Sequence, residues 1–174
     1  MTIDELVAAF AALPGARVGA GPRHPVRPDA TLTPRLTAFF ALYPPLANDA
    51  GYAELLWKYG GLARSDESED QLFDVFGFGA DVVDLDQDLY GPGVDEQGFF
   101  IVAEAVVHAD TADGPDTYEY DFALSVAGDR EPGVYVFTST LTARAPEWTR
   151  YADDFTAFLA DAVERGTVWP RPAL

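Results

Sequence analysis

The sequence contains no cysteine, only one lysine and only two histidines. Without cysteine the chain cannot form a disulfide or a thiolate metal site, and nothing in it requires an oxidising compartment. It has no apolar run of the roughly 18 residues that a membrane helix needs. Its first residues include Asp4 and Glu5, where a secretory signal would carry basic residues. We therefore expect a cytoplasmic protein with no membrane contact.

Common catalytic and nucleotide-binding motifs are also missing. With no cysteine and no Gly-x-Ser-x-Gly elbow, we do not expect covalent catalysis. His24 and His108 are too few for a multi-histidine zinc site, and an isolated histidine is usually a solvated residue. Gly77-Phe78-Gly79 has Val82 where a dinucleotide-binding motif needs its third glycine. The sequence thus predicts neither an enzyme nor a bound cofactor.

Basic residues are absent from a long central segment. Between Ser65 and Asp129 there is no lysine or arginine, whereas 18 of the 29 acidic residues lie there. The rest of the chain holds 11 acidic and 11 basic residues, so this segment accounts for the net charge of −18. Such a field repels nucleic acid and anionic membranes and speeds the encounter with a basic partner. The alternative is that the charge serves solubility alone.

Three N-terminal segments carry apolar residues at helical spacing. The first, 3–13, follows the capping box Thr2-Ile3-Asp4-Glu5. The second opens at Thr33-Pro34 and is expected to end at Pro44-Pro45. Asn48-Asp49 caps the third, and Gly60-Gly61 ends it. The segment between the first two helices is rich in glycine, proline and arginine and is predicted to be irregular.

After residue 70 the period of the apolar residues changes from helical to two. We expect strands in segments 72–78, 99–107, 117–126 and 134–141, joined by short connections that favour an antiparallel meander. Pro146 is then expected to open a final helix, with Trp148, Tyr151, Phe155 and Leu159 on its core face.

This order of elements predicts an α+β fold, with N-terminal helices and a C-terminal helix packed on a mostly antiparallel sheet. We expect a single domain over residues 1–174, because no linker or repeat divides the chain. Within it, 1–33 would hold the first helix and the irregular connection, 34–166 the core, and 167–174 a tail.

Two groups of carboxylates invite a chemical interpretation. Asp84, Asp86 and Asp88 alternate as in a calcium loop, but the glycine and the final glutamate of such a loop are missing. A half-exposed strand gives the same alternation, so we predict no metal site, although a divalent cation there stays open. Glu104 with Glu119 or Asp121 could pair across strands as an acid–base dyad. In so acidic a chain, ordinary surface carboxylates are the expected interpretation.

Two aromatic residues are candidates for anchoring a partner. Trp57 lies away from the apolar face of the third predicted helix, and Tyr90 stands at the tip of a Gly- and Pro-rich loop. Trp and Tyr are enriched among the residues that dominate binding energy. For Trp57 the alternative is packing under the loop that follows Gly61, because large aromatic side chains usually find cover.

Several short segments resemble the SMI1/KNR4 family of the SUKH superfamily. Tyr43-Pro44-Pro45-Leu46, leading into a helix that ends at Gly60-Gly61, is similar to that family's proline-led helix. Gly133-Val134-Tyr135-Val136-Phe137 resembles its late strand, and 153–159 its closing helix, with Asp154 in place of the usual serine. Residues 66–98 match no part of the family pattern.

This resemblance implies an α+β fold without catalytic residues. Many bacterial members of the family are thought to be immunity proteins that neutralise a toxin, often a nuclease, whereas eukaryotic members act as regulatory or scaffolding modules. We therefore expect an immunity-type protein whose partner is a basic toxin domain, with a regulatory or scaffolding module as the alternative. The predicted partner-binding residues are Asp66, Glu67, Glu69, Asp70, Asp84, Asp86 and Asp88, with Trp57 or Tyr90 as anchor.

Overall fold

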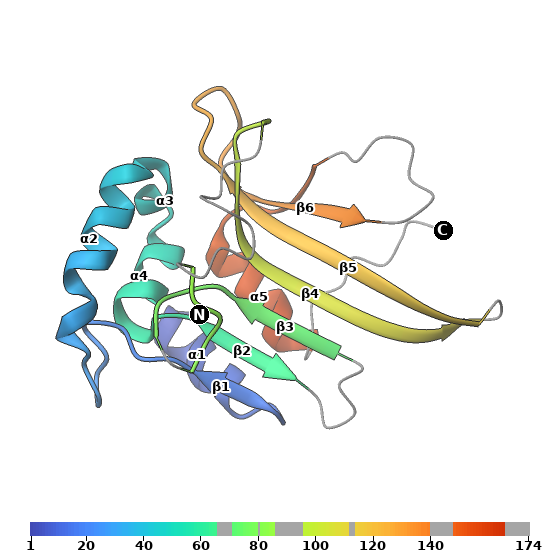
Figure 1. The fold of residues 1–174 in the computed structure, drawn as a ribbon, viewed down its shortest axis with the longest axis horizontal. Helices are drawn as coiled ribbons and strands as arrows, with labels where there is room; N and C mark the ends of the chain where they lie inside the picture. Colours follow the sequence, from blue (N-terminus) through green and yellow to red (C-terminus); the bar gives the residue numbers. More distant parts are fainter. Residues whose placement is uncertain (66–70, 80, 86–95, 112–113, 140–147, 166–174) are drawn as a thin grey trace.

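An antiparallel sheet forms the frame of the protein (Figure 1). The computed structural model describes residues 1–65, 71–79, 81–85, 96–111, 114–139 and 148–165. Within these ranges seven strands follow one another across the sheet in chain order, and each pairs antiparallel with the next. They are β1 (Ala16–Val18), β2 (Leu62–Ser65), β3 (Gln71–Val75), β4 (Phe99–Thr111), β5 (Gly114–Ser125), β6 (Val134–Ser139) and β7 (Thr149–Ala152). The predicted α+β class and antiparallel meander are confirmed.

The described part of the chain also contains five α-helices and one short 3-10 helix. They are α1 (Ile3–Ala11), η1 (Ala30–Leu32), α2 (Thr33–Leu42), α3 (Pro44–Asn48), α4 (Ala50–Tyr59) and α5 (Phe155–Arg165). In Figure 1, α1 and α5 lie behind the sheet, and α2 and α3 stand at one end of the molecule. Side chains of α1, α4 and α5 share one hydrophobic core with the sheet. None of the helices described here is long and apolar enough to cross a membrane.

The start of α1 follows from its capping box. The Thr2 hydroxyl accepts the backbone N–H of Glu5 at 3.2 Å, and the Glu5 carboxylate accepts that of Thr2 at 2.8 Å. The apolar residues that follow are buried, and the ring of Phe10 lies 6.0 Å from that of Phe73 in β3. The sequence therefore predicted both this helix and its buried face correctly.

One aspartate caps two helices that are far apart in the sequence. Oδ1 of Asp49 accepts the backbone N–H of Tyr52 in α4 at 3.0 Å, and Oδ2 accepts that of Phe155 in α5 at 2.9 Å. The first N–H groups of a helix have no partner inside the helix, so this carboxylate satisfies one in each and joins the two helix starts. At its other end α4 stops at Gly60, whose φ of 74° favours glycine.

Side chains along each strand alternate between two faces of the sheet. On β5, Tyr120, Phe122 and Leu124 are buried against the helices, and the ring of Phe122 lies 4.9 Å from that of Phe158 in α5. Asp121 points to the opposite face, which none of the described helices covers. We call this opposite face the open face of the sheet.

Several elements differ from what the sequence predicted. The short strands β1 and β2 were not expected. Pro44 and Pro45 begin α3, where the residue pattern predicted the end of a helix and only the family resemblance implied a proline-led one. Strand β7 occupies the place where the last helix was expected to begin, and α5 starts only at Phe155. The rings of Tyr151 and Phe158 nevertheless lie 6.1 Å apart. The apparent helical stripe came from two elements that converge on the same core.

Candidate functional site

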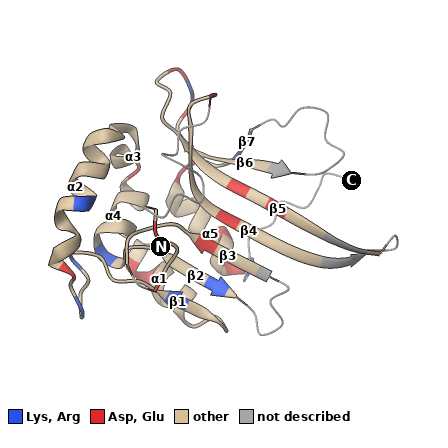
Figure 2. Cartoon of the chain, in the orientation of Figure 1, with Lys and Arg blue, Asp and Glu red and all other residues tan. Residues whose placement is uncertain are grey.

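A row of side chains crosses the open face from strand to strand. The register places Asp74 of β3 opposite Glu104 of β4, and Glu104 opposite Asp121 of β5. Figure 2 shows acidic segments side by side on these three strands. Because neighbouring strands lie about 4.8 Å apart, the three residues fall within about 10 Å. The row continues to Ala63 and Arg17 on one side and to Phe137 on the other.

The surroundings of this row disfavour negative charge on two of its carboxylates. Burial raises the pKa of Asp74 to about 6; the charge of Glu104 also raises it, and Arg17 acts in the opposite direction. Burial likewise raises the pKa of Asp121 to about 6, with added contributions from Glu104 and Glu119. Like charges opposite each other on neighbouring strands are destabilising. At neutral pH the sheet therefore holds these two carboxylates ionised against an unfavourable setting.

Aromatic rings gather beside the carboxylates on the open face. The ring of Phe99 stacks on Trp148 with centroids 4.6 Å apart, and Tyr135 lies 5.0 Å from it. Trp148 also lies 5.3 Å from Phe137, and the Arg130 guanidinium stands 4.3 Å from the centre of the Phe99 ring. We call these five residues the aromatic cluster. Phe137 joins it to the carboxylate row, because Phe137 is the cross-strand partner of Asp121.

The position of Trp148 corrects a prediction. The sequence placed this residue on the core face of the last helix, but it precedes β7 and stacks on the open side of the sheet. The side chain is half-buried, whereas the ring of Phe99 beneath it is fully buried. Its helical spacing to Tyr151 and Phe155 was therefore misleading.

The carboxylate row is suited to binding lysine or arginine side chains, not a metal ion. Nowhere in the described ranges do three histidine, aspartate or glutamate side chains stand where they could hold a metal ion together. His108 is exposed and pairs with the hydroxyl of Thr117 at 2.8 Å, about 13 Å along β4 from Glu104. A lysine or arginine side chain can form an ion pair with a carboxylate and, at the same time, a cation–π contact with an aromatic ring.

The sequence located part of this row. It offered Glu104 with Glu119 or Asp121 as a possible cross-strand pair, although ordinary surface carboxylates were the expected interpretation. The register makes Asp121 the direct partner of Glu104, while Glu119 stands opposite Val106. It did not include Asp74, because its place depends on the register between β3 and β4. A signal was present, since Asp74 is the single charge of β3 and Glu104 is the single charge in the apolar segment 99–107 of β4.

Two predicted partner-binding residues lie in the described part of the chain, and neither is on the open face. Asp84 is half-buried and binds Arg35 of α2, with 3.0 Å between Oδ1 and Nη2. Trp57 is half-buried under Arg23, whose guanidinium stands 4.3 Å from its ring centre, and it also contacts Phe40. Among the described residues, Trp57 is covered by Arg23 of the connection before α2 and by Phe40 of α2. The others lie outside the described residues: Asp66, Glu67, Glu69, Asp70, Asp86, Asp88 and Tyr90.

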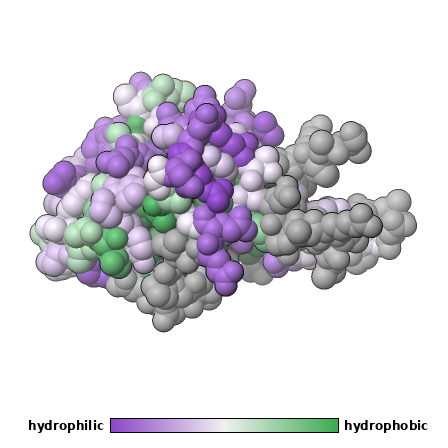
Figure 3. All heavy atoms as spheres, turned by 90° about the horizontal axis from the view of Figure 1, so that it is seen from above, coloured by the Kyte–Doolittle hydropathy of each residue, from purple (hydrophilic) through white to green (hydrophobic). Residues whose placement is uncertain are grey.

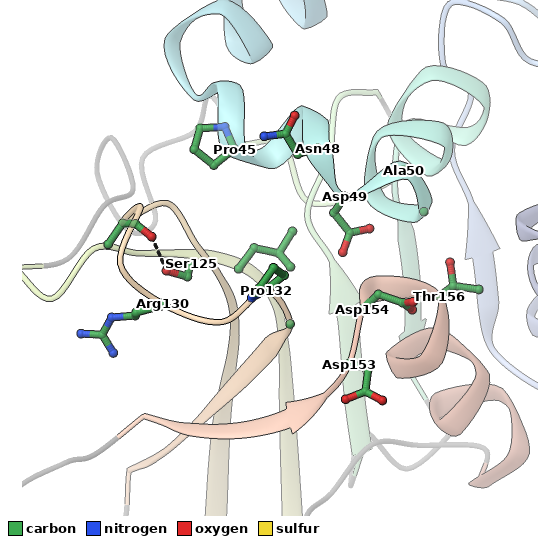
Figure 4. Close-up of a pocket in the computed structure, with 14 residues that line it drawn as sticks. Pro45, Asn48, Asp49, Ala50, Ser125, Arg130, Pro132, Asp153, Asp154 and Thr156 are labelled. Atoms are coloured by element: carbon green, nitrogen blue, oxygen red, sulfur yellow. Dashed lines mark hydrogen bonds between the residues drawn. The ribbon is translucent and has the colours of Figure 1, made fainter.

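A hollow of about 460 Å³ lies where the starts of α4 and α5 meet the turn between β5 and β6 (Figure 4). Asp49, in the wall of this hollow, accepts the two backbone N–H groups at the starts of α4 and α5. Asp154 accepts the backbone N–H of Ala157 at 2.7 Å. Asp153 pairs with Arg150 at 2.9 Å. Because these carboxylates already serve the fold, we place the candidate site on the open face and not in this hollow.

Comparison with known proteins does not identify the chain. No protein-family model, no curated protein and no solved structure matches it. The resemblance to the SMI1/KNR4 family stays a prediction, and the function has to be argued from the open face.

Proposed function

We propose that this chain is a non-catalytic, immunity-type protein that holds a basic toxin domain on the open face of its sheet and neutralises it in the cytoplasm. The observation that carries the proposal is the row of Asp74, Glu104 and Asp121, in register across three adjacent strands. Lysine or arginine side chains of a partner would compensate a charge that the sheet itself disfavours.

Proton binding supports this proposal energetically. In the free protein the pKa values of Asp74 and Asp121 are raised to about 6, chiefly by burial. A cation placed against a carboxylate lowers its pKa. By linkage, the partner then binds best when both groups are already ionised. Affinity is expected to be constant above about pH 6 and to weaken below it.

The aromatic cluster offers a partner the packing contacts that the carboxylates alone cannot provide. Charge attraction speeds an encounter, but binding energy concentrates in a few well-packed aromatic and arginine residues. Phe137, half-buried and opposite Asp121, offers a ring beside a carboxylate. An arginine of the partner is the side chain best suited to use both, by ion pairing with one and stacking on the other.

A basic toxin domain fits the charge and the family resemblance together. Nucleases bind the phosphate backbone through lysine and arginine, so an acidic protein that occupies those residues blocks their substrate. The acidic segments predicted from the sequence, which include Asp66, Glu67, Asp86 and Asp88, would add long-range attraction.

The test is a binding titration with any basic toxin-like domain that the genes beside this one prove to encode, purified for the purpose. The double variant Asp74→Asn/Asp121→Asn is expected to weaken binding by at least about tenfold, because two charge pairs with the partner are lost. The matched control is Asp129→Asn/Glu131→Gln, which makes the same change in net charge on exposed residues of the turn before β6. Calorimetry at low and high salt separates local pairing from overall charge.

Equal weakening by the two double variants would refute the open face as the binding surface, since net charge alone would then explain the effect. If no neighbouring domain binds, and expression of the chain protects no cell from such a toxin, the regulatory or scaffolding alternative replaces the immunity proposal.

A further inference from the structure

Hydrophobic atoms on the face of the molecule seen in Figure 3 form small, separate groups among hydrophilic ones. Apolar side chains scattered in this way are normal on a protein surface and do not define a docking site. The connection between β1 and η1, residues 19–29, is a more informative feature and is drawn in blue between β1 and α2 in Figure 1. It holds no acidic residue before Asp29, and the fold of its second half depends on one histidine.

The first half of the connection is fixed to the C-terminal end of α4 through its backbone. The N–H of Gly21 donates to the carbonyl of Lys58 at 3.0 Å, and that of Arg23 donates to the carbonyl of Trp57 at 2.8 Å. The last carbonyls of a helix have no partner inside the helix, so the connection satisfies two of them. A Cβ atom at position 21 would stand 2.4 Å from the carbonyl oxygen of Leu56, so this close approach requires glycine. Residues 19–23 are therefore anchored.

The second half of the connection, residues 24–28, folds around the side chain of His24. Nδ1 of His24 accepts the backbone N–H groups of Val26 and Arg27 at 3.2 and 2.9 Å. The imidazole ring meets the ring of Tyr59 in α4 edge-on, with centroids 5.4 Å apart. A ring nitrogen that accepts hydrogen bonds cannot carry a proton. This turn therefore exists only while His24 is neutral.

The turn places Arg27 against the outermost strand of the described sheet. The Arg27 guanidinium donates to the carbonyls of Val18 and Gly19 and pairs with Asp81 at 3.2 Å. Strand β1 is the last strand on its side of this sheet. The edge of a sheet offers backbone groups with which an extended segment of another chain can pair. Arg27 thus occupies backbone acceptors at this edge.

We infer that His24 is a pH-sensitive clasp, which holds residues 24–28 and the Arg27 side chain against the edge of the sheet at neutral pH and releases them in acid. Protonation would place an N–H on Nδ1, facing the N–H groups of Val26 and Arg27. It would also add a positive charge to a connection whose charged neighbours, Arg23 and Arg27, are both positive. The clasp lies apart from the carboxylates of the open face, so the inference does not rest on the proposed function.

The groups of α4 and α1 that lie near the imidazole do not compensate such a charge. Tyr59 is a neutral ring, and its hydroxyl donates to Asp4 of α1 at 2.8 Å. Asp4 is itself paired with Lys58 at 2.9 Å. In agreement with this geometry, burial and then the charge of Arg27 lower the pKa of His24 below 6.5.

The direction of the pH dependence follows from linkage. The released connection takes up a proton with the ordinary histidine pKa of 6.5, whereas the closed connection takes it up only at lower pH. Closure is therefore complete above about pH 6.5 and is lost as pH falls through the lowered pKa. Within this window the equilibrium constant for release should rise by up to about tenfold for each unit of pH.

The experiment measures amide hydrogen exchange of the full chain by NMR at about pH 7.5 and about pH 5. The protection factors of the Val26 and Arg27 amides should fall by at least about tenfold in acid, and those of Gly21 and Arg23 should fall less. His24→Asn is the matched variant, because the asparagine oxygen can accept the same N–H groups without titrating. It should keep the protection at both pH values, whereas His24→Ala should lack it at both.

Two further NMR signals make the test decisive. The loss of protection should follow the titration of the His24 ring, observed through its own resonances. Contacts between the side chain of Arg27 and Val18, seen as nuclear Overhauser effects, should disappear together with the protection in the wild type and persist in His24→Asn. Asp74 and Asp121 also titrate near pH 6, but both proteins contain them, so they cannot cause a difference between the two.

Protection that is equal at both pH values in the wild type would overturn the inference. So would an equal loss in the wild type and in His24→Asn, since a group other than His24 would then be responsible. If the contacts between Arg27 and Val18 persist after the two amides have lost their protection, the clasp does not control the edge of the sheet.

Discussion

Asparagine in place of Asp121 is expected to stabilise the folded protein at neutral pH. Burial, Glu104 and Glu119 all raise the pKa of Asp121, to about 6 from an ordinary 3.8. The amide keeps the shape of the side chain and removes the charge that this setting disfavours. This substitution therefore removes an unfavourable interaction, although most point substitutions destabilise.

The magnitude follows from the shift in pKa. A shift of about two units corresponds to a ceiling of about 3 kcal/mol, at about 1.36 kcal/mol per unit. Asp121 is partly exposed, and solvent screens its interactions with the neighbouring carboxylates. We expect a gain of about 1–2 kcal/mol in the free energy of unfolding.

The sign of the pH dependence distinguishes this explanation from others. Between about pH 4 and pH 6 the folded state binds more protons at Asp121 than the unfolded state does, so stability falls as pH rises through this window. Above about pH 6 the penalty is complete and constant, and below about pH 4 both states are protonated and it vanishes. The stabilisation by Asp121→Asn should therefore be full near neutral pH and absent in acid.

Urea unfolding of the wild type and the variant at several pH values is the assay. Asp129→Asn, the same change in an exposed turn, is the control and should alter stability little at any pH. If Asp121→Asn lowers stability at neutral pH, the carboxylate is being stabilised by a partner within the chain. The energetic basis for placing a binding site on the open face would then be lost.

Two further predictions concern the helix starts and the connection before α2. Asp49→Ala leaves the backbone N–H groups of Tyr52 and Phe155 without their acceptor. Urea unfolding should show that the free energy of unfolding falls by about 2–4 kcal/mol. A loss no larger than that of Asp154→Ala, which removes one cap, would contradict the double role of Asp49. Nδ1 of His24 accepts the N–H groups of Val26 and Arg27 at 3.2 and 2.9 Å, and burial followed by the charge of Arg27 lowers its pKa below 6.5. The stability that His24 contributes is present above about pH 6.5 and is lost as pH falls through the lowered pKa. His24→Ala should therefore lower the free energy of unfolding by about 1 kcal/mol near pH 7.5 and by less near pH 5. An equal loss at both pH values would show that protonation of His24 is not involved.

Local chemistry let the sequence predict some elements closely. The capping box at Thr2 and Glu5, the aspartate cap at Asp49 and the glycine stop at Gly60 all lie where they were expected. Each depends on hydrogen bonds or dihedral angles within a few residues, which a sequence displays directly. The alternation along 117–126 was predicted for the same reason, because a strand with one buried face shows its period without its neighbours.

The failures depended on contacts between distant residues. The four-residue strand β2 lies between β1 and β3 and shows no pattern of its own. The residue pattern predicts that a helix stops at Pro44 and Pro45, but proline is also favoured in the first turn of a helix, which is where these two residues lie in α3. The second cap that Asp49 makes joins it to Phe155, 106 residues away. Such a bond cannot be inferred before the fold is known.

The carboxylate row lies between these two cases, and this bears on its interpretation. Asp74 and Glu104 could be recognised as isolated charges within apolar segments, but only the register makes them direct neighbours. Adjacent strands normally avoid like charges at opposed positions, because these are destabilising. This sheet has two such pairs in line, Asp74 with Glu104 and Glu104 with Asp121. Proteins commonly depart from local rules of this kind at functional sites. The proposed binding of a basic partner would account for the placement of these three residues, because its cations would compensate their charges.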